Sequence, residues 1–127
     1  MSTQAAGMNE PVVLVVDDEP AVCRLTARIL IEVGFHALEV HSGEAAIMLL
    51  AEMRGNVQLV VSDNAMPGMT GEALAATMAD RWPQTRFLLI SGQGGPTREY
   101  TGPFLGKPFA PEALLGAIAG LTPIPAQ

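Results

Sequence analysis

The sequence predicts a single α/β domain: a doubly wound, five-stranded parallel sheet with helices on both of its faces. Five short apolar runs alternate with segments whose apolar residues recur at helical spacing, which is the pattern of consecutive strand–helix units. The first run, VVLVVD, is apolar without alternation until its last residue, as is typical of a parallel strand covered on both sides. The predicted domain spans residues 11–121, between a disordered lead (1–10) and a disordered tail (122–127).

Five strands are expected where apolar and β-branched residues gather. They are placed at 12–17, 35–40, 56–63, 86–91 and 102–106. The run at 35–40, FHALEV, alternates between apolar and polar residues, which predicts a half-covered strand at the edge of the sheet.

Residues that favour helix ends delimit the expected helices. Pro20 suits a first helical turn, and Gly34 suits the position just beyond a last turn. The apolar face of this first helix is expected to consist of Val22, Leu25, Ile29 and Val33. The later helices are expected to follow the N-cap residues Ser42 and Thr70, and to begin at Pro111, with ends near Met53, Arg81 and Leu121.

The segment between the fourth and fifth strands is too short and too rich in glycine for a full helix. Ser91 and Lys107 are close in sequence, and the stretch GQGGPTREYT between them holds three glycines and a proline. Each glycine in a helix costs about 1 kcal/mol relative to alanine. The fourth helix is therefore predicted to be shortened or lost, with at most one turn at 96–100.

The charge balance and composition exclude several classes of protein. The net charge is −6 and the seven basic residues are scattered, which argues against direct nucleic-acid binding. No apolar run approaches the ~18–20 residues that span a bilayer, so no membrane segment is expected. The single cysteine, Cys23, excludes an internal disulfide and indicates a reducing, cytoplasmic environment.

Side chains that can bind metal ions or take part in catalysis lie at the ends of the predicted strands. Asp17 and Asp18 end the first strand, Asp63 the third and Ser91 the fourth, while Lys107, the only lysine, follows the fifth. The carboxyl ends of parallel strands lie at one edge of a sheet, where ligands collect. These five residues are therefore expected to converge.

Three converging carboxylates repel one another, and without relief at least one would keep its proton at neutral pH. Mg²⁺ removes this conflict, because it takes oxygen ligands and needs only one or two direct carboxylates. A carboxylate can also act as a nucleophile and form an aspartyl-phosphate. A metal ion, a lysine and a hydroxyl are the groups that stabilise charge on a transferring phosphoryl group.

Four motifs, VVDDEP, VVSDNAMPGMTG, LLISG and FLGKPF, occur in this order in the chain. Together they resemble the receiver domain of two-component response regulators, over roughly residues 11–121. The resemblance implies a CheY-like, flavodoxin-like fold with strand order 2-1-3-4-5. It also implies a phosphorelay protein that takes a phosphoryl group from a histidine kinase or a histidine phosphotransfer protein and then switches conformation.

The same resemblance assigns the acidic residues. It makes Asp63 the phosphoacceptor and Asp18 a direct Mg²⁺ ligand. Asp17 would hold the metal mostly through water, and the backbone carbonyl of Ala65 would supply a further ligand.

The resemblance also assigns the residues that handle and report the phosphoryl group. Ser91 and Lys107 occupy the catalytic hydroxyl and lysine positions, and Phe104 the position of the switching aromatic ring. Lys107–Pro108 is expected to be a cis peptide. Such a domain is not an enzyme in the ordinary sense, because it catalyses only its own phosphorylation and dephosphorylation. Its output partner is not named by the sequence, and a weak homodimer is compatible with it.

Other functions fit the residues less well. Phosphohydrolases with an aspartate nucleophile typically need a second aspartate two residues later, where this chain has Ala65. A carrier of flavin mononucleotide needs hydroxyls and amides after the first strand, where DDEP would repel a phosphate. The glycines at 92–95 lack the lysine and helix of a P-loop. A pseudo-receiver that only binds partners stays open as the alternative.

Overall fold

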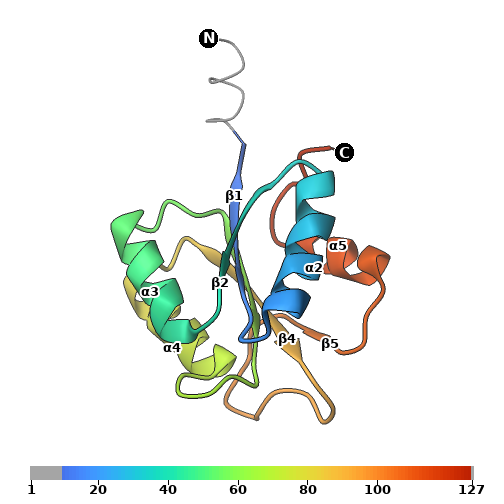
Figure 1. Ribbon diagram of the computed structural model, residues 1–127. Helices are drawn as coiled ribbons and strands as arrows, with labels where there is room; N and C mark the ends of the chain where they lie inside the picture. The colour runs from blue at the N-terminus through green and yellow to red at the C-terminus, as the bar shows by residue number, and fades with distance from the viewer. Residues whose placement is uncertain (1–9, 127) are drawn as a thin grey trace.

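A computed structural model describes residues 10–126 of the chain. Its centre is a five-stranded parallel sheet in the order β2-β1-β3-β4-β5 (Figure 1). The strands are β1 (Val12–Val16), β2 (His36–Val40), β3 (Leu59–Asp63), β4 (Arg86–Ser91) and β5 (Phe104–Gly106). The predicted strand order is confirmed, and the alternating strand does lie at an edge.

Within residues 10–126, four helices cover the sheet, two on each face (Figure 1). They are α2 (Pro20–Glu32), α3 (Gly43–Glu52), α4 (Gly71–Arg81) and α5 (Pro111–Ala119). Figure 1 shows α2 and α5 on one face and α3 and α4 on the other. Ser42 and Thr70 cap their helices as predicted, since their side chains accept hydrogen bonds from the amides of Ala45 and Ala73.

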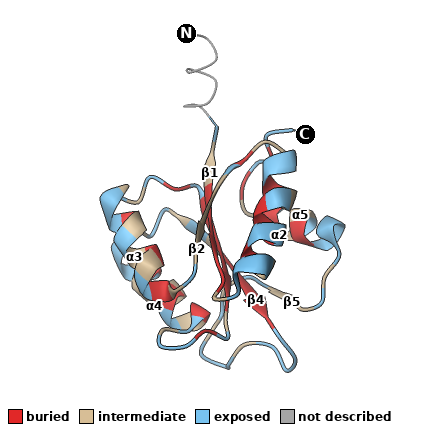
Figure 2. Cartoon of the chain, viewed as in Figure 1, coloured by how far each residue is buried: buried red, intermediate tan, exposed pale blue. Residues whose placement is uncertain are grey.

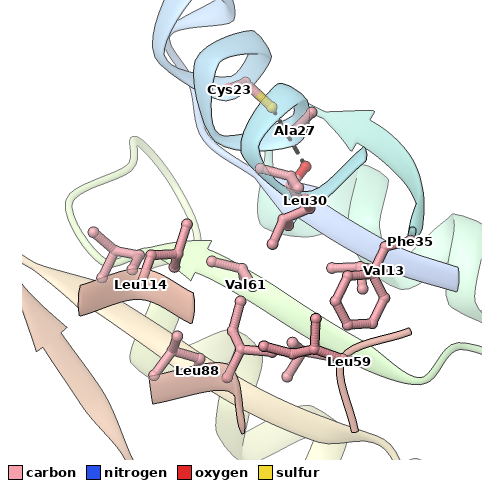
Figure 3. Close-up of a cluster of buried hydrophobic side chains, with 13 residues drawn as sticks. Val13, Cys23, Ala27, Leu30, Phe35, Leu59, Val61, Leu88 and Leu114 are labelled. Carbon is pink, nitrogen blue, oxygen red and sulfur yellow. Dashed lines mark hydrogen bonds between the residues drawn. The ribbon is translucent and has the colours of Figure 1, made fainter. Parts of the chain in front are cut away.

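The core forms two apolar layers because alternate residues of the buried strands point to opposite faces. One layer joins β1, β3 and β4 to α2 and α5 through residues such as Val13, Val61, Leu30 and Leu114 (Figure 3). The other layer lies under α3 and α4. Among the strands, burial is concentrated in β1, β3 and β4, which lie between the two helical layers (Figure 2).

The buried face of α2 differs from the prediction. Cys23, Thr26, Ala27 and Leu30 are buried, whereas Leu25, assigned to the apolar face, is 62% exposed. Cys23 and Ala27 are small and allow α2 to lie close to the sheet. Leu25 lies on the outer side with the exposed Arg24 and Arg28. The helix has apolar residues on several sides, so spacing alone did not identify its buried stripe.

The chain after α5 also differs from the expectation of a disordered tail. Thr122 and Ile124 are buried. The Gln58 side chain donates to the Thr122 hydroxyl at 2.7 Å, and the Ala126 amide donates to the Val33 carbonyl at 2.9 Å. These contacts fix the segment after α5 against the amino-terminal end of the sheet. Residues 1–9 of the expected lead, and residue 127, lie outside the described residues.

The connection between β4 and β5, residues 92–103, contains turns and no helix. The predicted loss of the fourth helix is confirmed. A groove of about 600 Å³ lies beside this connection, lined by α4 residues such as Ala73 and Ala76 together with Phe87 and Tyr100. Among residues 10–126, no helix is long and apolar enough to cross a membrane.

Candidate functional site

The candidate residues lie at strand ends whose positions are fixed by backbone hydrogen bonds between neighbouring strands. The Asp17 amide donates to the Val40 carbonyl at 3.1 Å, which extends the β1–β2 pairing past the last residue of β1. On the other side of the sheet, the Lys107 amide donates to the Ser91 carbonyl at 2.8 Å. Asp63 is itself the last residue of β3 and pairs with β4. The sheet therefore fixes the backbone from which each functional side chain projects.

The three aspartates form one cluster. Asp17, Asp18 and Asp63 each offer a carboxylate oxygen, and these oxygens lie within 4.8 Å of one another. Asp17 and Asp63 are only 6% exposed, and Asp18 is more open to solvent. One oxygen of Asp17 accepts a hydrogen bond from the Glu19 amide at 3.0 Å, which fixes its orientation.

Lys107 supplies the cation that faces this cluster. Its Nζ lies 2.7 Å from Asp63 Oδ1, and its side chain is 34% exposed. Burial acts to lower the pKa of Lys107, but the hydrogen bond and charge of Asp63 outweigh this and raise the pKa. The lysine is therefore a permanently charged group at neutral pH, positioned on one oxygen of Asp63.

One lysine does not balance three carboxylates. Burial raises the pKa of Asp17, and the neighbouring charges of Asp63 and Asp18 add to this effect against the Glu19 amide and Lys107. A hard divalent cation with oxygen ligands relieves this kind of crowding. The donor set and spacing of the cluster therefore fit Mg²⁺.

The other predicted site residues differ in their exposure to solvent. Ser91 is 2% exposed at the end of β4. Ala65 lies in the loop after β3, and within residues 10–126 its carbonyl accepts no backbone hydrogen bond, which leaves that oxygen free for a ligand. Phe104 is 52% exposed at the start of β5. Lys107–Pro108 is a cis peptide, as expected.

Sequence reasoning missed a second set of residues that supports the pocket. Asn64 follows Asp63 and exchanges two hydrogen bonds with Glu72: its amide group donates to Oε2 at 3.1 Å, and its oxygen accepts from the Glu72 backbone at 3.0 Å. Glu72 also accepts hydrogen bonds from the backbone and hydroxyl of Thr97. The sequence signal was Asn64 directly after the strand and an acid in the first turn of α4.

Gly71 was also missed, although it sets the distance between α4 and β3. A Cβ at this position would lie 2.5 Å from the Asp63 carbonyl oxygen and 2.9 Å from Asn64 Cα. Only glycine allows the helix to begin this close to the strand end. The close approach holds α4 directly behind Asp63.

Residues 13–119 match the sequence profile of the family described as "Response regulator receiver domain". The chain belongs to this receiver family. The receiver is 34% identical over 113 residues to the response regulator protein FleR of Pseudomonas aeruginosa, with 84% of this chain aligned to 24% of FleR. It is 35% identical over 104 residues to the sensor kinase CckA of Brucella abortus, with 77% of this chain aligned to 11% of that protein.

A solved structure agrees with this assignment. The receiver domain of the hybrid histidine kinase CckA superposes with a TM-score of 0.74 at 28% identity, over 91% of this chain and 99% of that one. The aligned region spans only a quarter or less of the length of FleR and of the sensor kinase CckA. Receiver domains act in two-component signalling, interact with histidine kinases and output domains, and generally use Mg²⁺ at an acidic pocket. They are generally not enzymes in their own right.

Proposed function

We propose that this receiver takes a phosphoryl group onto Asp63 from a histidine kinase or a histidine phosphotransfer protein. The observation that carries the proposal is the contact between Lys107 Nζ and Asp63 Oδ1 within the three-aspartate cluster. An aspartate that only forms a structural salt bridge in a turn is not expected to lie beside two further carboxylates. Here they create a negative excess that a bound divalent cation would relieve.

In the proposed step, a carboxylate oxygen of Asp63 attacks the phosphorus of a phosphohistidine. The new O–P bond forms as the N–P bond breaks, and the bonding pair leaves with the imidazole nitrogen, which is then protonated. Lys107 contacts Asp63 Oδ1 before the reaction and can follow the negative charge onto a phosphoryl oxygen afterwards. Ser91, at the end of the neighbouring strand, donates a hydrogen bond to the same group.

Asp18 and Asp63 would hold Mg²⁺ directly, Asp17 would do so mostly through water, and the Ala65 carbonyl would complete the protein ligands. When bound, Mg²⁺ neutralises charge on the phosphoryl oxygens. The pairing of a buried, oriented Asp17 with a more open Asp18 supports this division of roles.

The conformational output is proposed to start from Ser91 and Phe104. Movement of Ser91 toward the phosphoryl group would leave space at the end of β4. The exposed ring of Phe104 would then turn inward to fill it. Without a helix between β4 and β5, this movement would be transmitted to an irregular connection, and a partner would read that connection and not a helix face.

The proposal is tested with acetyl phosphate and Mg²⁺ as a minimal donor system. Intact-mass spectrometry should detect one added phosphoryl group in the parent and none in Asp63→Asn. Asp80→Asn is the matched control, because Asp80 is the only aspartate outside the cluster and is exposed on α4. Full phosphorylation of Asp63→Asn would overturn the assignment. A folded parent that gains no phosphoryl group from acetyl phosphate or a phosphotransfer protein would favour the pseudo-receiver alternative.

A further inference from the structure

A second cluster of metal-ligating side chains lies beside the acidic pocket, on the β2 side of the sheet's carboxyl edge. Cys23, Glu39 and His41 offer a sulfur, a carboxylate oxygen and an imidazole nitrogen that all lie within 4.8 Å of one another. None of these residues belongs to the acidic pocket. They come from two elements, α2 and the end of β2.

The fold brings the three residues together by simple geometry. Glu39 is in β2 and His41 follows it two residues later, so their side chains project from the same face of the edge strand. Ala37, two residues before Glu39, packs into the apolar layer under α2, which identifies that face. Cys23 is on the side of α2 that packs on the sheet, as Figure 3 shows.

The cluster has a closed inner end and an open outer end. Cys23 is fully buried, and its thiol lies 3.5 Å from the Val15 carbonyl and 3.7 Å from the Val40 carbonyl. Glu39 is half-buried and His41 is exposed. The depth thus runs from a buried sulfur to a solvent-facing imidazole, which leaves an entry path for an ion.

The ligand atoms of this cluster favour a different metal from the one that the acidic pocket favours. Thiolate and imidazole ligands favour Zn²⁺ and similar transition metals, whereas Mg²⁺ prefers oxygen. Three protein ligands with one open position are the arrangement of zinc sites that keep a bound water or another ligand.

The distances require only a small adjustment. In a tetrahedral zinc site, bonds of about 2.0–2.3 Å place neighbouring ligand atoms roughly 3.3–3.6 Å apart. The side chains of Glu39 and His41 are at or near the surface and can close the difference by rotation. Glu39 must release Arg24, whose Nε lies 3.6 Å away on a 71% exposed side chain. Ion pairs that are open to solvent contribute little to stability, so the release opposes binding only weakly.

We propose that Cys23, Glu39 and His41 form a site for Zn²⁺ or a similar thiophilic divalent metal, distinct from the acidic pocket and independent of phosphorylation at Asp63. The metal displaces the thiol proton of Cys23, which leaves to solvent as the sulfur–metal bond forms. Burial, with the charges of Glu39 and Asp17, raises the pKa of Cys23 to about 11, so the free thiol is protonated at neutral pH and one proton is released per site. Glu39 and His41 complete the protein ligands.

Cobalt(II) tests the site, because a thiolate ligand gives it a charge-transfer absorption in the near ultraviolet that oxygen ligands do not. The purified chain is titrated with Co²⁺ in excess Mg²⁺, which occupies the acidic pocket. One equivalent should produce the thiolate band, and Zn²⁺ should displace it. His41→Ala should weaken Co²⁺ binding at least about tenfold, and Cys23→Ser should abolish the band.

His36→Ala is the matched control, since His36 is the only other histidine, is exposed, and lies on the same strand. It should bind Co²⁺ as the parent does. Circular dichroism of each variant separates loss of the ligand from loss of the fold, and His41 is exposed, so its removal should leave the fold intact. Absence of a thiolate band in the parent, or equal weakening in His36→Ala and His41→Ala, would overturn the site. Neither result would bear on phosphorylation of Asp63, which is measured separately.

Discussion

The acidic pocket and the connection at 92–103 share one edge of the sheet but are held there by different forces. Asp17, Asp63 and Lys107 are attached to strands whose backbone hydrogen bonds continue up to the functional residues. The connection is exposed almost throughout, and its side-chain attachment to the body consists of the hydrogen bonds between Thr97 and Glu72. At its end, the Pro103 carbonyl accepts a hydrogen bond from the Leu89 amide. Its own internal contacts are few, among them the Tyr100 hydroxyl donating to the Pro103 carbonyl at 2.6 Å.

This contrast separates the acidic pocket, where phosphorylation is proposed, from the connection at 92–103, where the conformational change is expected. Groups fixed by a buried ladder keep their geometry through ordinary fluctuations. Segments with few buried contacts open at low free energy. The absence of a fourth helix therefore leaves the geometry of the acidic pocket intact, and the connection beside it is the segment expected to open first. The two regions meet at Glu72, which touches Asn64 behind the pocket and Thr97 in the connection.

The largest expected difference between the two regions is in their tolerance of an added methyl group. Gly71→Ala would place its Cβ 2.5 Å from the Asp63 carbonyl oxygen, against backbone that cannot yield without moving α4. We expect a loss of about 2–3 kcal/mol in the free energy of unfolding, measured in urea. Gly92→Ala, in the connection, would meet nothing within 4 Å and should be neutral or raise stability by up to about 1 kcal/mol. Equal stability of the two variants would show that the contact between α4 and β3 is not fixed.

A smaller effect is expected from the cation of the pocket. Lys107→Ala removes the partner of Asp63 and leaves three carboxylates together. Breaking a buried pair costs several kcal/mol, but Lys107 is about one-third exposed, so we expect a loss of about 1–2 kcal/mol without metal. Saturating Mg²⁺ should reduce this loss, because it supplies the missing positive charge. Arg98→Ala, an exposed cation of the connection, serves as the control and should change neither value. A loss that Mg²⁺ leaves unchanged would assign Lys107 a packing role.

The sequence predicted the rigid region better than the loosely held one, for a physical reason. Strand ends follow from runs such as VVLVVD, so the convergence of Asp17, Asp63 and Lys107 could be predicted from topology alone. Helix caps at Ser42 and Thr70 have local side-chain signatures. The absence of the fourth helix followed from glycine content, because propensity decides where no apolar face can be buried.

Features that depend on contacts between distant segments were not predictable in the same way. The bridge from Glu72 to Thr97 joins residues that are far apart in the chain, and no local pattern indicates it. The burial of Ile124 depends on space left by α2 and α5. The requirement for Gly71 depends on how closely α4 approaches β3. Each of these is a property of packing between elements and not of any one segment.

A third prediction concerns repulsion within the pocket. Asp18→Ala should leave stability without metal unchanged or raise it by about 0.5–1 kcal/mol, because one of three crowded charges is removed. The same change should abolish most of the stabilisation that Mg²⁺ gives the parent. Asp80→Ala, outside the cluster, should keep that stabilisation. A clear loss of stability in metal-free Asp18→Ala would identify Asp18 as a structural residue of the loop.

The smallest expected effect lies at Glu72, where the two regions meet. The hydroxyl and amide of Thr97, and more weakly Asn64, lower the pKa of Glu72 below its ordinary value of 4.5. A carboxyl whose pKa is lowered on folding stabilises the folded arrangement above its unfolded pKa, and this contribution is lost as the pH falls through the lower, folded value.

The Thr97 amide proton should therefore shift in NMR spectra with a midpoint below 4.5, and the connection should lose protection against hydrogen exchange over the same range. In Glu72→Gln this transition should disappear, and the connection should already exchange faster at neutral pH, while Glu99→Gln, an exposed acid of the same connection, should behave as the parent. An unchanged Thr97 titration in Glu72→Gln would mean that the connection is held by its own turns and not by the helix behind the pocket.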